Sequence, residues 1–173
     1  MNNINLPIHY NKNIILEDNS FKCRLNNVGL YSIHCNLAIN KIIDGLESIL
    51  IKNKMTIFNK IDHTKGAEKV GIMMPPTEVI IFGNPNVGSL LMKDNHTIAI
   101  DLPQKILVTQ DKNNDKVSII YFNDPFYIAK RHGITDKKDI LINLRTILLS
   151  LILSLFKIKT CSLIITNVFS GKL

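Results

Sequence analysis

The chain has 173 residues, a hydrophobic fraction of 46% and a formal net charge of +7. This size fits one domain, and the hydrophobic fraction excludes a disordered chain. Residues 1–27 carry three basic and two acidic groups, residues 28–135 carry twelve and ten, and residues 136–173 carry six and two. Because the middle of the chain is nearly neutral and no basic face stands out, the charge argues against a nucleic-acid partner.

Residue usage indicates the base composition of the source genome and the cellular compartment of the protein. Ile, Asn and Lys are frequent, as is typical of an AT-rich genome. Cys23, Cys35 and Cys161 form no C-x-x-C pair and lack a nearby His at zinc-finger spacing, which favours reduced thiols. The first residues, with Pro7 and His9, do not resemble a signal peptide. We therefore expect a cytoplasmic protein without a metal or another cofactor.

The first half of the chain predicts strands around one amphipathic helix. Residues 1–27 are expected to be a polar N-terminal extension, with at most a short strand at Ile14–Leu16. Apolar residues then recur at helical spacing from Leu37 to Leu50. The other expected elements are a strand at 28–34, a strand at 55–61, a helical turn at 63–70, a buried strand at 78–82 and a loop with a partial helical turn at 86–96.

The second half predicts a hairpin followed by helices. Strand is expected at 98–100 and 105–109, with a turn at 111–115 and a returning strand at 117–122. Asp124-Pro125 is typical of a helix start, and this helix should end at Gly133. A longer helix follows over 137–156. Residues 157–173 are expected to be a separate, atypical tail.

The order of these elements is β-α-β-β-β-β-α, which predicts an α+β two-layer sandwich with helices on one face of an antiparallel sheet. We expect one domain over residues 28–156. The helix from Ile140 to Phe156 is apolar on almost every side and carries Arg145. We interpret it as a buried helix or a dimer face, and membrane association through it is the alternative.

Four segments carry a family resemblance. They are Phe58–His63 with Gly66-Ala67, Pro76–Pro85, Ile100–Pro103 leading to Leu107-Val108, and Tyr121–Pro125 with Arg131–Gly133. In this order and spacing, from about Val28 to Ile134, the chain resembles the domain of unknown function 302 family. The resemblance implies a curved antiparallel sheet with helices on one side, similar to the TATA-binding-protein-like fold, and a homodimer. It implies no agreed activity, and a fold alone does not fix a function.

Polar residues of these segments fall at strand ends and turns, where sites are commonly built. The candidates are Asp62, His63, Asn84, Asp101, Asn123, Asp124, Arg131 and His132. In a purely structural interpretation Asp62 and Asp124 cap helices, Asn84 adopts a left-handed turn, and Arg131 pairs with Asp101 or Asp62.

Two functional interpretations stay open for the same residues. Arg131 and His132 could bind a small anionic ligand, because a guanidinium forks onto carboxylates and phosphates. Alternatively, His63 and His132 with the Asp62 carboxylate could form a metal or acid–base site. We expect a non-enzymatic, dimeric domain that binds a small molecule or serves a structural role, and the metal or acid–base enzyme is the alternative.

Overall fold

The computed structural model describes residues 16–18 and 21–156. The strands are β1 (Leu16–Asp18), β2 (Phe21–Leu25), β3 (Leu30–Cys35), β4 (Thr56–Asp62), β5 (Thr77–Gly83), β6 (Gln104–Gln110) and β7 (Ser118–Asn123). The helices are α1 (Ile39–Lys52), α2 (His63–Glu68), α3 (Pro85–Asp94), α4 (Pro125–Arg131), α5 (Lys138–Ser154) and a 3₁₀ helix, η1 (His96–Ile100).

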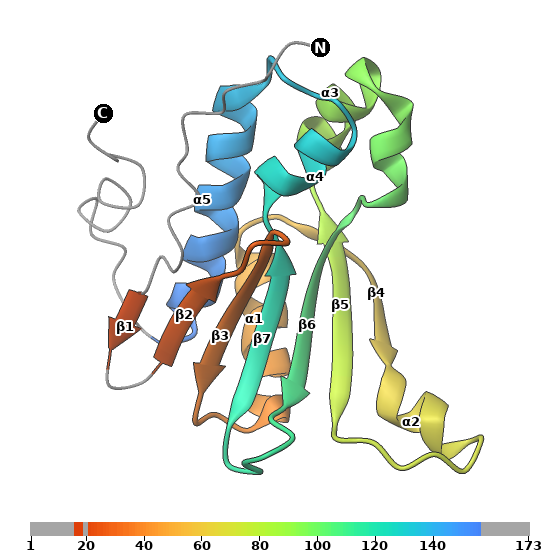
Figure 1. The fold of residues 1–173 in the computed structure, drawn as a ribbon, viewed down its shortest axis with the longest axis vertical. Helices are drawn as coiled ribbons and strands as arrows, with labels where there is room; N and C mark the ends of the chain where they lie inside the picture. The colour runs from red at the N-terminus through yellow and green to blue at the C-terminus, as the bar shows by residue number, and fades with distance from the viewer. Residues whose placement is uncertain (1–15, 19–20, 157–173) are drawn as a thin grey trace.

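The strands form one sheet in the order β1-β2-β3-β7-β6-β5-β4, and all neighbours are antiparallel (Figure 1). The α+β class and the antiparallel sheet are thus confirmed. The short helices lie at the two ends of the strands, with α2 at one end and α3, η1 and α4 at the other. We call these the α2 end and the α3 end.

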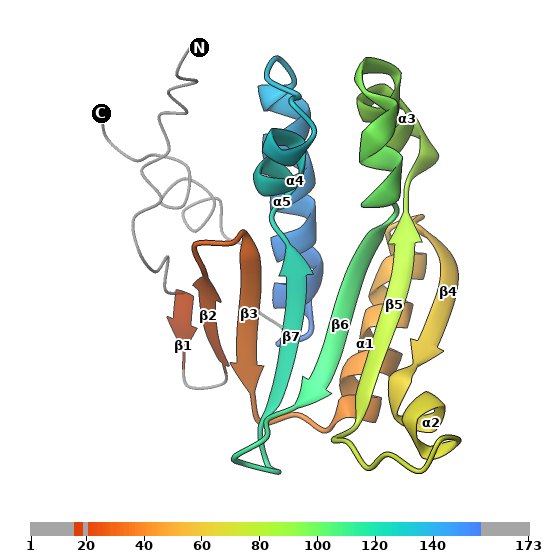
Figure 2. The same ribbon diagram turned by 45° about the vertical axis from the view of Figure 1, so that its right-hand side comes forward.

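Helices α1 and α5 cover one face of the sheet (Figure 2). Ile80, Ile106 and Ile120 point to this face and are fully buried. The apolar stripe of α1, with Ile42 and Leu46, packs in the same core. Strand residues alternate between two faces and helix residues recur every three or four positions, so each pattern buries one side of its element.

The other face, the open face, carries a row of half-buried side chains across four strands. Ile61, Val79, Leu107 and Tyr121 are successive partners in the ladder from β4 to β7. No helix among residues 21–156 lies over this row in Figure 2. In β4, the outer strand at this side of the sheet, the register shifts between Ile57 and Asn59, which marks a β-bulge.

Three predicted elements differ from the structure. The stretch 86–96, expected to be a loop with a partial helical turn, contains most of the ten-residue helix α3, which Asn84 caps. The stretch expected to be a polar extension contributes β2, whose Phe21 and Cys23 are buried while Lys22 and Arg24 are more exposed. The alternation of buried and more exposed residues in β2 is short, and many polar residues surround it, so the sequence does not indicate it clearly. Residues 98–100 form part of η1 and not a strand, because Asn95 caps a helical turn by accepting the N–H of Thr97.

The turn from β2 to β3 sits against α4. Gly29 has a φ of +72°, and an added Cβ would lie 2.2 Å from Cγ of Tyr127. The carbonyl of Gly29 accepts the N–H of Asp124 at 2.7 Å. Only glycine combines this backbone conformation with such a close approach.

The helix α5 packs inside the protein. Leu148, Leu151 and Ile152 are buried in the main core. Within residues 16–18 and 21–156, no helix combines the length and the apolar character needed to cross a membrane. The interpretation of 140–156 as a buried helix therefore fits the structure.

Candidate functional site

The eight polar candidates are divided between the two ends of the sheet. Asp62 and His63 lie at the α2 end, where Asp62 pairs with Glu78 at the start of β5. The other six lie at the α3 end, where hydrogen bonds between side chains join Asp101, Arg131 and His132, and the remaining three have separate surroundings. Asp62-His63 and Arg131-His132 therefore do not share one rim of the sheet, because β4 is antiparallel to β5 and ends where β5 begins.

At the α2 end, Asp62 caps α2. Its Oδ1 accepts the N–H of Lys65 at 2.9 Å, and its Oδ2 lies 3.1 Å from the Lys65 ammonium. These contacts lower the pKa of the Asp62 carboxyl, with the backbone hydrogen bond as the main cause. His63 is exposed in the first turn. The structural interpretation accounts for Asp62 completely.

At the α3 end, Asp101 joins two of the candidates. Its Oδ1 accepts from Arg131 Nη1 at 3.2 Å, and its Oδ2 accepts from His132 Nε2 at 2.6 Å. The second ring nitrogen, Nδ1 of His132, lies 2.8 Å from Thr97 Oγ1. Asn95 Nδ2 also donates to the backbone carbonyl of His132 at 2.6 Å. This Asp101–His132 network fastens η1 to the end of α4, and His132 is buried within it.

Asp124 belongs to a second group with a partner that sequence reasoning missed. Arg145 on α5 donates from Nε and Nη2 to the two Asp124 oxygens at 2.8 and 2.7 Å, and both residues are buried. The guanidinium also stacks on Phe126, 4.1 Å from the ring centroid. Burial raises the pKa of the Asp124 carboxyl, and Arg145 opposes that rise. The signal in the sequence is Arg145 itself, a single charged residue in an apolar stretch, because a buried charge normally has a partner.

The two remaining candidates differ in surroundings. Asn123 ends β7 opposite Leu30 and is exposed. Asn84 caps α3, and its Oδ1 accepts the N–H of Asn86 at 3.0 Å. Its φ is −121°, so the expected left-handed conformation is wrong. Asn84 also lines a cavity, as described next.

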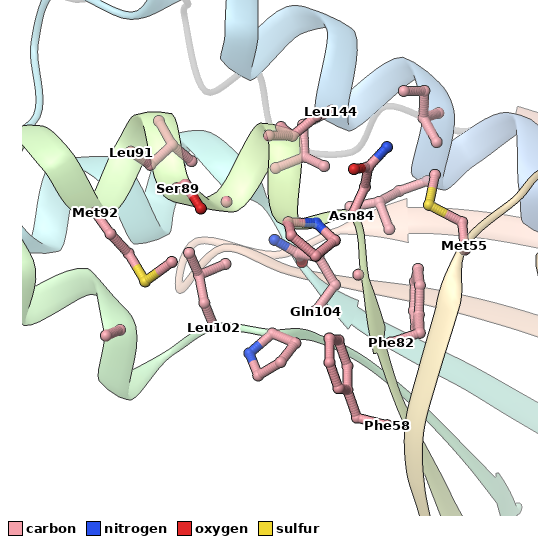
Figure 3. A pocket seen from close by; sticks show the side chains of 18 residues that line it. Met55, Phe58, Phe82, Asn84, Ser89, Leu91, Met92, Leu102, Gln104 and Leu144 are labelled. Carbon is pink, nitrogen blue, oxygen red and sulfur yellow. The ribbon is translucent and has the colours of Figure 1, made fainter.

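The cavity lies between α3, α5 and the adjoining ends of β4, β5 and β6, and we call it the α3–α5 cavity (Figure 3). Its volume is about 250 Å³. Its walls are mostly apolar, with Phe58, Phe82, Met92, Leu102 and Leu144 among them. Phe58 is 52% exposed, so this wall of the cavity reaches the protein surface. Small-molecule sites commonly combine such walls with a few polar groups.

Three polar side chains line the cavity, and Gln104 is the buried one. Gln104 is 6% exposed at the start of β6. Its Nε2 is buried and has no hydrogen-bond partner among the residues that the structure describes. A buried donor without a partner costs about 1–3 kcal/mol, so such groups normally have one. Asn84 and the exposed Ser89 are the other two.

Gly88 in α3 leaves part of the space open. A Cβ built on Gly88 would lie 3.8 Å from Cδ1 of Leu102 and 3.9 Å from Cε of Met92, and both residues line the cavity. Glycine inside a helix costs about 1 kcal/mol relative to alanine. The absence of a side chain at this position therefore enlarges the cavity at the expense of helix stability.

The chemistry of these groups favours binding over metal ligation. None of the 18 described residues that line the cavity carries a charge. Elsewhere in the described ranges, no three His, Cys, Asp or Glu side chains are grouped to hold a metal ion. His63 and His132 lie at opposite ends of the sheet and cannot share one ion. Sequence reasoning missed Gln104, since a glutamine after a Leu-Pro turn carries no pattern.

The chain is similar to proteins of one family. The family model described as "Domain of unknown function DUF302" matches residues 31–151. A solved structure of an uncharacterized conserved DUF302 protein from Bacillus stearothermophilus superimposes with a TM-score of 0.64. It covers 72% of this chain and 95% of that protein, at 18% identity, and thus supports the fold.

Curated relatives come from Brucella. The chain is 36% identical over 114 residues to proteins named fluoride-specific ion channel FluC 1, from Brucella suis and Brucella abortus, and FluC 2, from Brucella melitensis. The match covers 66% of this chain. It spans only 44% of the Brucella suis protein and 42% of the other two.

Proposed function

Since this chain belongs to the DUF302 family, whose shared domain has no known function, we propose a function from its geometry: it binds a small, mostly apolar molecule in the α3–α5 cavity. The observation that carries this proposal is the buried Gln104, which lines the cavity and whose Nε2 has no hydrogen-bond partner among the described residues. An apolar cavity with one unused donor suits a ligand that fills the space and completes the hydrogen bond.

We propose that the bound molecule is not chemically transformed. The side chains that line the cavity include neither a carboxylate, an imidazole, an amine nor a thiol among the described residues. General acid–base and covalent catalysis need such groups within hydrogen-bonding reach of the substrate. At this end, Asp101 and His132 are hydrogen-bonded to each other, and Asp124 is paired with Arg145.

The first experiment measures binding of α-methylstyrene, a small apolar probe, by chemical-shift changes in two-dimensional NMR. We expect saturable shifts at residues around the cavity. Gly88→Leu places a side chain in the cavity and should abolish them. Gly66→Leu adds the same side chain in α2, where a Cβ meets nothing within 4 Å, and should leave binding intact. Absence of saturable shifts in the unchanged protein, with α-methylstyrene and with the oxygen-bearing probe acetophenone alike, would refute the proposed function.

We further propose that two copies pair through the open face. The supporting feature is the row of Ile61, Val79, Leu107 and Tyr121, in which Ile61 is 38% exposed. A second copy brings the same row, and a self-complementary surface closes at two subunits. Light scattering at micromolar concentration should give twice the monomer mass, and Leu107→Lys should give the monomer. The exposed Asn143→Lys on α5 is the control, and a monomeric unchanged protein would contradict the pairing.

We propose a cytoplasmic location on the state of the thiols. Cys23 and Cys35 are both buried and free, and burial raises the pKa of Cys23 to about 12. Such thiols stay protonated and unreactive, which suits a reducing compartment. Cys161 lies outside the described residues. Cell fractionation tests this location, and recovery outside the cytoplasm would overturn it.

A further inference from the structure

We infer that the ligand of the α3–α5 cavity is an uncharged molecule with a carbonyl-type oxygen, such as a ketone, ester or amide, on an apolar body. This inference rests on the proposed function and adds the chemical class of the ligand to it. It follows from the position of one hydrogen-bond donor, from the absence of charged side chains among the described residues that line the cavity, and from the volume of the cavity.

The donor defines which ligand atom is recognised. Gln104 Nε2 is an N–H donor, and it is buried in a wall whose other members are mainly aliphatic and aromatic. A ligand oxygen that accepts from Nε2 removes the cost of an unpaired buried donor. A hydrocarbon of the same shape fills the cavity equally well but leaves the donor unpaired. The cavity should therefore distinguish two isosteres that differ only in this oxygen.

The charge of the walls defines the ionic state of the ligand. No lysine, arginine or histidine is among the described residues that line the cavity. A carboxylate would enter an apolar space without a cation, and burial of an unpaired charge is strongly unfavourable. Arg131, the arginine expected to bind an anion, is instead paired with Asp101, and its side chain is 61% exposed. The geometry therefore favours a neutral carbonyl compound over its carboxylate analogue.

The size of the space limits the apolar body. A cavity of about 250 Å³ is smaller than the roughly 300–1,000 Å³ of sites for drug-sized ligands. A single aromatic ring or a short aliphatic chain beside the carbonyl matches this volume. Figure 3 places Gln104 between Leu102 and Phe82 among the side chains of the wall, and the ligand oxygen is assigned to this part of the cavity.

The test compares acetophenone with α-methylstyrene, which replaces C=O by C=CH₂ in nearly the same shape. NMR titration of the unchanged protein should give a dissociation constant roughly tenfold lower or better for acetophenone, as expected for pairing a buried donor. In Gln104→Met, which keeps the length and removes the amide, the preference should disappear while α-methylstyrene still binds. Gln110→Met makes the same substitution at the other end of β6, outside the cavity, and should leave the preference unchanged.

Further probes test separately which atom recognises the ligand and whether the ligand is neutral. Indole and its isostere indene differ by an N–H donor, and a preference for indole without one for acetophenone would overturn the assignment of Nε2 as the recognising atom. Benzoate that binds more tightly than acetophenone would overturn the neutral class. If α-methylstyrene binds and acetophenone gains nothing, this inference fails and the proposed function stands. If no probe binds, the proposed function itself has failed.

Discussion

The two ends of the sheet use an aspartate at the same local position with opposite consequences. Asp62 is the last residue of β4 and Asp124 directly follows the last residue of β7, and each caps the helix that follows. Asp62 keeps solvent access, and the N–H of Lys65 lowers its pKa. Asp124 is completely buried with Arg145, and burial raises its pKa. The difference shows that a capping position determines the local backbone geometry, whereas the elements that pack over the aspartate determine the direction in which its pKa shifts.

The covering elements also explain why the cavity lies at the α3 end. Helix α5 and the α3–η1 segment meet over the strands there, whereas α2 is a six-residue helix with no buried residue. Packing between large elements can leave a closed space, while a short helix on the surface encloses none. The predictions below test this contrast between an enclosed end and an exposed end.

The largest effect is expected for Arg145→Met. This change leaves the buried Asp124 carboxylate without its cation and should lower the free energy of unfolding by about 3–5 kcal/mol. Urea denaturation measures it. The double variant with Asp124→Asn should recover much of the loss, since no charge then remains buried alone. Arg131→Met removes the exposed arginine next to Asp101 and should cost less than about 1 kcal/mol. An equal loss of unfolding free energy in Arg145→Met and Arg131→Met would contradict the contrast between a buried and an exposed ion pair.

A smaller effect is expected for Gly29→Ala. The left-handed backbone costs about 1–2 kcal/mol, and the clash with Tyr127 should raise the total to about 3 kcal/mol. Gly71→Ala, at the α2 end, has a φ of +74° but meets nothing within 4 Å, so it reports the backbone cost alone. Thermal unfolding compares the two. If the Gly29 variant is no less stable than the Gly71 variant, Tyr127 and α4 move away from the added methyl group without loss of stability.

Thr97→Val tests the link between η1 and α4. The isosteric change removes the hydroxyl 2.8 Å from His132 Nδ1 and should cost about 1 kcal/mol. Amide hydrogen exchange should accelerate in η1 more than in α1. Thr64→Val, which removes the acceptor for the N–H of Thr77 at the α2 end, is the matched change. Exchange that accelerates equally everywhere would assign the effect to global stability instead of the link.

The smallest effect is expected at Asp62, and it depends on pH. Because the folded-state pKa is lowered, the ionised carboxylate stabilises the protein above its unfolded value of 3.8, and this stabilisation is lost as pH falls through the folded value. Asp62→Asn should therefore melt below the unchanged protein at pH 6, with the gap closing below pH 4. Melting curves at several pH values measure this, and a gap that stays constant would show that only the cap hydrogen bond matters.

Regular elements were predictable from sequence because their patterns are local. The spacing of Ile42, Ile43 and Leu46 gives α1, and the mostly apolar run after the turn at 111–115 gives β7. The strand predicted at 98–100 failed because three residues are too few to separate a strand from a helical turn. The caps at Asp62 and Asp124 followed from residue type, and so did the pairing of Arg131 with Asp101.

The cavity was not predictable in this way. It depends on missing atoms at Gly88 and on the angle at which α5 crosses the end of the sheet, and neither leaves a motif. The partner of Asp124 lies 21 positions along the chain on α5, beyond the reach of local patterns. Tertiary packing therefore decided which of the polar residues became structural and where empty space remained.

The β-bulge in β4 bears on how copies of the protein can associate. An outer strand with a regular ladder offers a template on which further chains can add, one after another, as in fibres. The register shift between Ile57 and Asn59 interrupts that template, and Lys60 adds a charge beside it. Strand addition at this edge is thus disfavoured, whereas the proposed pairing through the open face would end at two copies. A single extra residue in β4 in this way works against open-ended growth along this edge.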